Sequence, residues 1–209
     1  VLAGSALLTW ITVAFMQVPL QSWTGRALNF FWSQDVLVRW ILLAGIPLML
    51  YSGLIQEGAK LVPVVIYWLR KGKNISPRLG LVIGAVAGLG FGVFEAVWVH
   101  NTVFISGWSW ETAEVTGLFW ALIPFLERFF VVAFHTAASA IAGWGLAKGK
   151  GWQFYLIVSF AHAFLNYSTI VFGAGLLSQL ELEIFIVACA LIVTVIALWL
   201  RYRKQKVTV

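Results

Sequence analysis

The chain consists largely of apolar runs that are long enough to cross a membrane, and this feature restricts its fold more than any other. A hydrocarbon core about 30 Å thick is crossed by roughly 20 consecutive apolar residues in a helix. We expect seven such spans, at about residues 1–20, 36–51, 53–69, 79–105, 118–147, 152–172 and 184–200. The sequence therefore predicts an all-α, polytopic transmembrane helix bundle.

The span count depends on the stretch from Val36 to Leu69. As one helix it would be about 51 Å long, well above the thickness of the hydrocarbon core. We therefore expect a break near residues 51–53, where Tyr, Ser and Gly follow one another. The alternative is one long helix kinked at Pro47, which would reduce the count to six spans.

Composition excludes the soluble classes. Of 209 residues, 61% are hydrophobic and 11% are charged, which is too little charge to cover the apolar surface of a soluble domain. The net charge of +6 does not indicate nucleic-acid binding, because the basic residues flank apolar runs.

The single cysteine, Cys189, cannot form an internal disulfide. With no repeat or linker visible, we expect residues 1–209 to form a single transmembrane domain.

The charges between the spans predict an orientation. The turns at 70–78 and 148–151 and the C-terminus with Lys204 and Lys206 are basic, whereas the loops between them lack Lys and Arg. The positive-inside rule places these basic segments in the cytoplasm. With seven spans the first would begin outside and end at Pro19, and the aromatic stretch from 21 to 35 would lie in the membrane interface.

One polar segment interrupts the apolar sequence near its centre. Gln56, Glu57 and Lys60 lie three to four residues apart, so they share one face of a helix. Ionisable groups are costly in hydrocarbon and are normally paired or functional. We therefore expect this segment to be half of a catalytic site.

Four predicted helices carry ionisable groups at similar depth. Counted from the nearest basic turn at 1.5 Å per residue, the heights are about 20 Å for Glu57, 26 Å for Glu95, 20 Å for His135 and 18 Å for His162. This agreement predicts that the four side chains meet. By the same count, His100 and Glu127 come out above about 30 Å, near the outer interface, and we leave both out of the site.

The set of side chains suits hydrolysis of an amide by activated water. Glu57 or Glu95 could take a proton from the water, and Lys60 would balance the charge of Glu57. Donors to the developing oxyanion would be His135, His162 and Asn166, the last one turn beyond His162. We expect no metal or other cofactor; a zinc-dependent protease is an alternative, although no H-E-x-x-H spacing is present. A proton- or ion-coupled transporter and a purely structural polar network are further alternatives.

Four motifs resemble those of a known family. They are Glu57-Gly58-Ala59-Lys60, Phe91-Gly92-Val93-Phe94-Glu95, His135 before Gly143-Trp144-Gly145, and His162-Ala163-Phe164-Leu165-Asn166. In order and type they are similar to the PrsW proteases, within the wider superfamily of CAAX prenyl proteases and bacteriocin-processing membrane proteins. The resemblance covers about residues 50–170.

The resemblance implies a glutamate-type intramembrane endopeptidase in a bacterial or archaeal plasma membrane. PrsW members cleave single-span anti-sigma factors on the extracytoplasmic side, so the expected partners are membrane lipid and a single-span protein or peptide substrate. One position departs from the motif: Gln56 occupies the place of its first Glu, to which the family assigns activation of water. Either Glu57 or Glu95 takes over this role, or the sequence is an inactive homologue or an inactivated variant.

Overall fold

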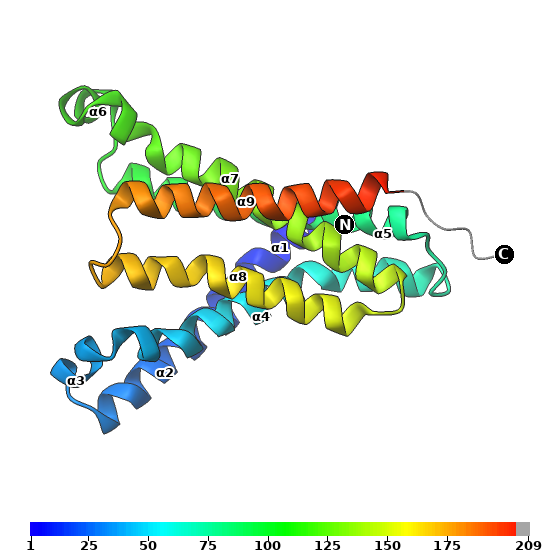
Figure 1. The fold of residues 1–209 in the computed structure, drawn as a ribbon, viewed down its shortest axis with the longest axis horizontal. Coiled ribbons are helices and arrows are strands. Elements are labelled where there is room, and N and C mark those ends of the chain that lie inside the picture. The colour runs from blue at the N-terminus through cyan, green and yellow to red at the C-terminus, as the bar shows by residue number, and fades with distance from the viewer. Residues whose placement is uncertain (204–209) are drawn as a thin grey trace.

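Within the part of the chain that the structure describes, every regular element is a helix. The structure is a computed structural model that describes residues 1–203, so Lys204 and Lys206 lie outside the described residues. In chain order the elements are α1 (Leu2–Thr12), the π-helix η1 (Val13–Gln17), α2 (Val18–Phe31), α3 (Gln34–Arg39), α4 (Ile41–Arg70), α5 (Pro77–Ile105), α6 (Trp110–Thr116), α7 (Leu118–Ala147), α8 (Gly151–Gly173) and α9 (Gln179–Tyr202). They form an elongated bundle (Figure 1). The predicted all-α polytopic class is confirmed.

Residues 1–203 contain six candidate spans, the alternative to the expected seven. Six helices are long and apolar enough to cross a membrane, and α4 is one of them. The expected break near residues 51–53 is wrong, because Gly53 belongs to a helix contact and not to a turn: a Cβ there would overlap the carbonyl oxygen of Ser159 on α8. Pro47 and Pro63 both lie inside α4. Tilt and proline kinks allow so long a helix to fit the bilayer.

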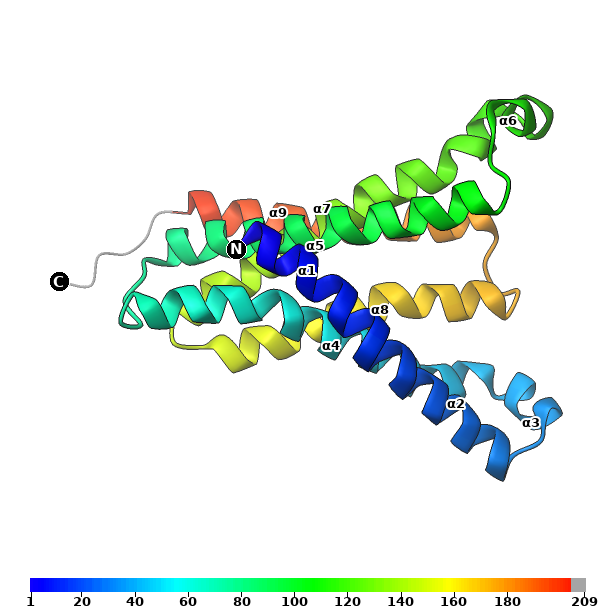
Figure 2. The ribbon, with the colours of Figure 1, turned by 180° about the vertical axis from the view of Figure 1, so that it is seen from behind.

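The first span is also longer than expected. α1, η1 and α2 form one continuous rod from Leu2 to Phe31, which crosses α4 and α5 diagonally (Figure 2). Pro19 does not end it, because the π-helix η1 lies directly before it, and such local adjustments accommodate a missing N–H inside a membrane helix. Gln21 continues the helix and donates from its amide to the carbonyl of Leu48 on α4 (2.8 Å). Most of the stretch from 21 to 35, which was expected to lie in the interface, thus belongs to the first span. A short separate helix, α3, follows it.

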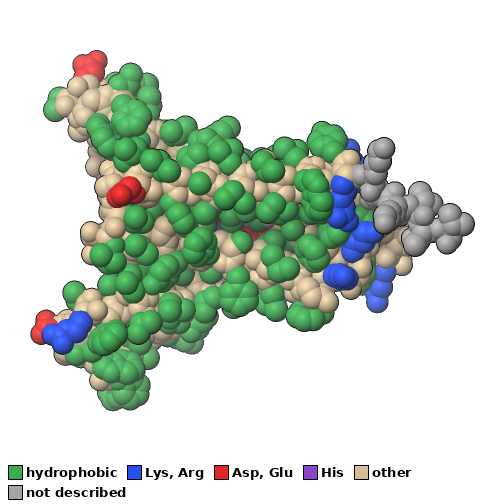
Figure 3. All heavy atoms as spheres, viewed as in Figure 1, with side chains coloured by type: hydrophobic (Ala, Val, Ile, Leu, Met, Phe, Trp, Pro, Cys, Tyr) green, Lys and Arg blue, Asp and Glu red, His purple; other side chains and the backbone are tan. Residues whose placement is uncertain are grey.

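Basic side chains gather at one end of the bundle (Figure 3). The turns after α4 and after α7 lie at this end, together with the end of α9 (Figure 1). Because the number of spans is even, Val1 and the end of α9 lie on the same side, so the expectation of opposite sides is wrong. With seven spans, the second span would begin on the side of the basic turns, and Arg39 would lie there too. This expectation is wrong, because α3, which carries Arg39, lies at the other end of the bundle.

Small residues bring α5 and α7 into backbone contact. Gly80, Gly84, Gly88 and Gly92 recur every fourth residue of α5, and such a stripe allows close helix approach in membranes. A Cβ at Gly88 would overlap the carbonyl oxygen of His135, and a Cβ at Gly84 would overlap that of Ser139. The stripe therefore fixes α7 against α5 at the level of His135.

We expect Gly88→Ala to lower the free energy of unfolding by about 1–3 kcal/mol, because the new methyl group meets backbone that cannot move aside. Thermal unfolding of the purified protein in detergent measures this effect. Gly25→Ala is the matched control: the same change on α2 meets nothing within 4 Å. Equal stability of the two variants would contradict the close packing of α5 on α7.

Candidate functional site

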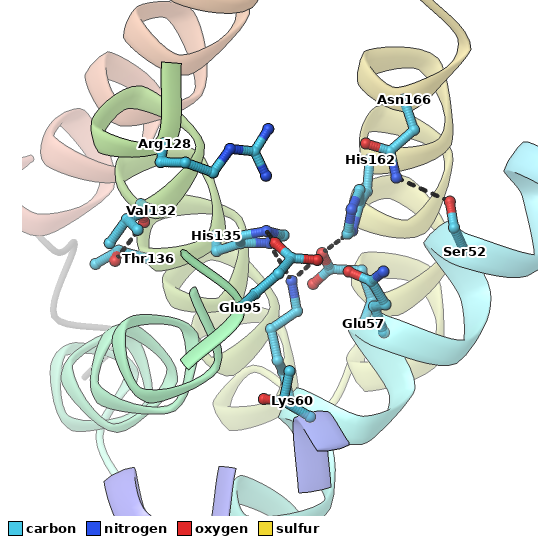
Figure 4. Close-up of polar contacts among 12 residues, drawn as sticks. Ser52, Glu57, Lys60, Glu95, Arg128, Val132, His135, Thr136, His162 and Asn166 are labelled. Atoms are coloured by element: carbon cyan, nitrogen blue, oxygen red, sulfur yellow. Dashed lines mark hydrogen bonds and ion pairs between the residues drawn. The ribbon is translucent and has the colours of Figure 1, made fainter. Parts of the chain in front are cut away.

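Five ionisable side chains from four spans form one connected cluster inside the bundle (Figure 4). We call it the buried cluster; its members are Glu57 and Lys60 from α4, Glu95 from α5, His135 from α7 and His162 from α8. Each span contributes one or two of them, so the cluster exists only when the bundle is assembled. The side chains that the sequence placed at similar depth thus meet.

Lys60 lies at the centre of the buried cluster. Its Nζ is 2.5 Å from Oε1 of Glu57 and 2.9 Å from Nδ1 of His135, and it faces the ring of Phe91 at 4.9 Å. Nδ1 of His162 lies 2.8 Å from the same Glu57 oxygen, and Nε2 of His135 lies 2.8 Å from Oε2 of Glu95. A continuous chain of contacts therefore joins the two carboxylates through an ammonium and an imidazole.

The two carboxylates differ in access. Glu57 is fully buried; its Oε1 contacts both Lys60 and His162, while its Oε2 has no hydrogen-bond partner among the described residues. The side chain of Glu95 is 20% exposed. A buried carboxylate oxygen without a partner is a position for a water molecule or a ligand. Glu95 is thus the acid that an incoming molecule can reach, and Glu57 anchors the interior.

Gln56 lies outside the contacts of the buried cluster, although its neighbour Glu57 is central. Its amide donates to the side-chain oxygen of Gln17 at the end of η1 (2.9 Å), and its own Oε1 is buried without a partner among the described residues. Sequence reasoning missed Gln17. The available signal was a lone amide in the first apolar run, but no pattern predicts the π-helix that precedes it.

Asn166 lies one turn beyond His162 but does not bond to it. Its amide donates to Oγ of Ser52 on α4 (2.9 Å), so it ties α8 to α4 beside the buried cluster (Figure 4). Ser139, one turn from His135, is buried, and its hydroxyl has no hydrogen-bond partner among residues 1–203. Neither imidazole therefore activates Ser139.

The outer polar residues divide into two groups. His100 stacks on Phe125 at 4.6 Å, and no hydrogen bond or ion pair joins it to the buried cluster among residues 1–203. Arg128 forms an ion pair with Glu127, and its guanidinium extends from α7 toward α8, on the side where Glu95 and His162 lie (Figure 4). The sequence analysis left Glu127 out of the site and did not select Arg128, which extends toward the buried cluster.

Three members of the buried cluster could hold a metal ion. Glu57, His135 and His162 each present a ligand atom, and these atoms lie within 4.8 Å of one another. A carboxylate and two imidazoles are the ligand types of many catalytic zinc sites. Nζ of Lys60 contacts two of these three residues, Glu57 and His135.

Comparison with known proteins assigns a family. The model of the family described as PrsW family intramembrane metalloprotease matches residues 1–200, and the chain belongs to this family. No curated protein and no solved structure matches the chain. Membership and the six apolar helices make the chain an integral membrane protein. The wider kinship with CAAX prenyl proteases remains a prediction from the four motifs.

Proposed function

We propose that this PrsW-family chain is an intramembrane endopeptidase that uses the buried cluster to hydrolyse peptide bonds with water. The observation that carries the proposal is the continuous contact from Glu95 through His135 and Lys60 to Glu57 and His162, assembled from four helices. The substrates that fit this position are single-span or membrane-proximal peptides, because the cluster lies within helices of membrane-spanning length.

In the proposed reaction Glu95 is the base. The water oxygen forms a bond to the carbonyl carbon, its proton passes to the reachable carboxylate of Glu95, and His135 holds that carboxylate in place. The Arg128 guanidinium donates to the carbonyl oxygen as it gains negative charge. Glu95 then returns the proton to the amide nitrogen, the C–N bond breaks, and a carboxylic acid and an amine leave.

The family description implies a metal, and the residues fit one. The unpartnered Oε2 of Glu57 and the ring nitrogens of His135 and His162 supply suitable donors, so these three residues would hold the ion. When bound, it supplies Lewis-acid polarisation of the carbonyl. His135 would then exchange its Nδ1 contact with Lys60 for the ion, and Glu95 at Nε2 would keep the ring in one orientation.

Two substitutions test the assignment of the base. We expect Glu95→Gln to lower the cleavage rate by about 10²–10⁴-fold, because an amide cannot accept the proton. Gln56→Glu should change the rate by less than about tenfold, because Gln56 contacts Gln17 and not the imidazoles. The assay is cleavage of single-span peptides carrying a quenched fluorophore, in liposomes containing the purified protein.

The opposite pattern would overturn the assignment. If only Gln56→Glu cleaves and the natural chain does not, the first motif position is the base. Unchanged cleavage by Glu95→Gln would remove Glu95 from the reaction. Thermal unfolding of both variants shows whether a lost rate reflects a lost fold.

We also propose that the basic end of the bundle faces the cytoplasm, as the positive-inside rule indicates. The turn after α4 belongs to this end, and its Ser76 caps α5. A cysteine in place of Asn74, in the same turn, should react with a membrane-impermeant thiol reagent only after cells are opened. Labelling of intact cells would reverse the orientation.

A further inference from the structure

A groove runs along the outside of the bundle between α5, α7 and α9, on the opposite face of α7 from the buried cluster. Its volume is about 460 Å³. Val132 and Thr136 line it, and Figure 4 shows both directed away from the site around His135. The hydroxyl of Thr136 donates to the carbonyl of Val132 (2.8 Å), so its hydrogen is already bonded within α7.

Small side chains make the floor of this groove and large ones make its rim. Ala137, Ala140 and Ala197 line it and are all buried. Phe129 and Leu198 also line it but are mostly exposed, so they form raised edges. Apart from Thr136 and Thr194, the residues that line the groove from Leu81 to Leu198 are apolar, which suits a hydrocarbon chain.

The groove has the length of one membrane leaflet. Along α7 it extends from Phe129 to Ala140, which is about 16 Å at 1.5 Å per residue. Half of a hydrocarbon core about 30 Å thick is about 15 Å. The groove therefore accepts a single acyl chain lying along the helices.

A cation lies at one end of the groove. Arg201 and Tyr202 line this end, at the close of α9. The same end of the bundle carries the basic turns (Figure 3). Arginine presents a planar donor fork that matches phosphate oxygens, and basic pockets between membrane helices bind anionic headgroups.

We propose that this groove binds one anionic phospholipid, with an acyl chain against the alanine floor of α7 and α9 and the phosphate at Arg201. Cleavage chemistry is not required for this site, so the proposal is independent of the proposed function. The lipid would lie directly behind the helix that carries His135 and would support its position.

Lipid retention tests this site. Native mass spectrometry of the purified protein, with phosphatidylglycerol or phosphatidylcholine added, should show one phosphatidylglycerol retained per chain in preference to phosphatidylcholine. We expect Arg201→Gln to weaken phosphatidylglycerol binding by roughly tenfold, because one charge-assisted contact to the phosphate is lost. Phosphatidylcholine should be weakened less, because its choline cation already offsets the charge of its phosphate. Ala133→Leu, which fills the groove, should weaken both lipids.

Arg70→Gln is the matched control: it removes the same charge at the same end of the bundle, on α4 and away from the groove. Equal retention of phosphatidylglycerol by the natural protein, Arg201→Gln and Arg70→Gln would overturn the proposal. A dimer that Ala133→Leu dissociates would overturn it too, since a second copy would then cover the groove. Arg201 is only partly buried, and thermal unfolding of Arg201→Gln in detergent shows whether the variant keeps its fold.

Discussion

Replacing His135 by Ala is expected to lower the rate of peptide cleavage by about a thousandfold, within the range for losing an acid–base partner. His135 contacts both halves of the buried cluster: Nδ1 lies 2.9 Å from Lys60 and Nε2 lies 2.8 Å from Glu95. Without the ring, Glu95 loses the group that orients it and Lys60 loses one of its two polar partners. The fluorescent-peptide assay in liposomes measures the effect.

His100→Ala is the matched control for this substitution. It makes the same chemical change on α5, where the ring stacks on Phe125 and contacts no member of the buried cluster. We expect its cleavage rate to remain within about threefold of the natural rate. Comparable losses in the two variants would mean that any histidine inside the bundle matters for folding alone, and the site would lose its support.

Much of the site could be predicted because depth in a membrane can be counted. Helices of fixed rise, starting from basic turns at one interface, place residues at calculable heights, and Glu57 and His135 both came out at about 20 Å. Height alone does not show which way a side chain points. Packing between helices turns these groups inward on α4, α5, α7 and α8. An example is the contact of Gly88 with the backbone of His135.

The failures of prediction have physical causes as well. Tyr51-Ser52-Gly53 has the composition of a turn, but in a membrane a Gly or Ser also serves close helix packing, and local sequence does not separate the two roles. The neighbour that decides the matter is Ser159, more than a hundred residues away. The contact between Gln17 and Gln56 likewise depends on a π-helix that periodicity does not reveal.

The orientation of Gln56 shows that losing the first Glu of the motif is not the same as losing the acid–base pair. A Gln at the first motif position removes one carboxylate, and from sequence this argues against activity. In the structure, however, Gln56 is turned toward Gln17, and the carboxylates that contact imidazoles are Glu57 and Glu95. The chain therefore keeps an acid–base pair and a separate buried anion, which is the minimum that the proposed hydrolysis requires.

Lys60→Met is expected to lower the free energy of unfolding by about 3–5 kcal/mol, the cost of leaving a buried charge without its partner. Lys60 and Glu57 are both fully buried, and among residues 1–203 only Lys60 and His162 bring a basic nitrogen within 4 Å of that carboxylate. Removing Glu57 in addition takes away the stranded anion. The double variant Lys60→Met with Glu57→Gln should therefore recover most of the lost stability, although both charges are gone. Thermal unfolding in detergent of the two single variants, the double variant and the exposed control Lys71→Met completes the cycle. If the losses of the two single variants simply add in the double variant, Lys60 and Glu57 do not act as a pair, and the charge balance assigned to the buried cluster is wrong.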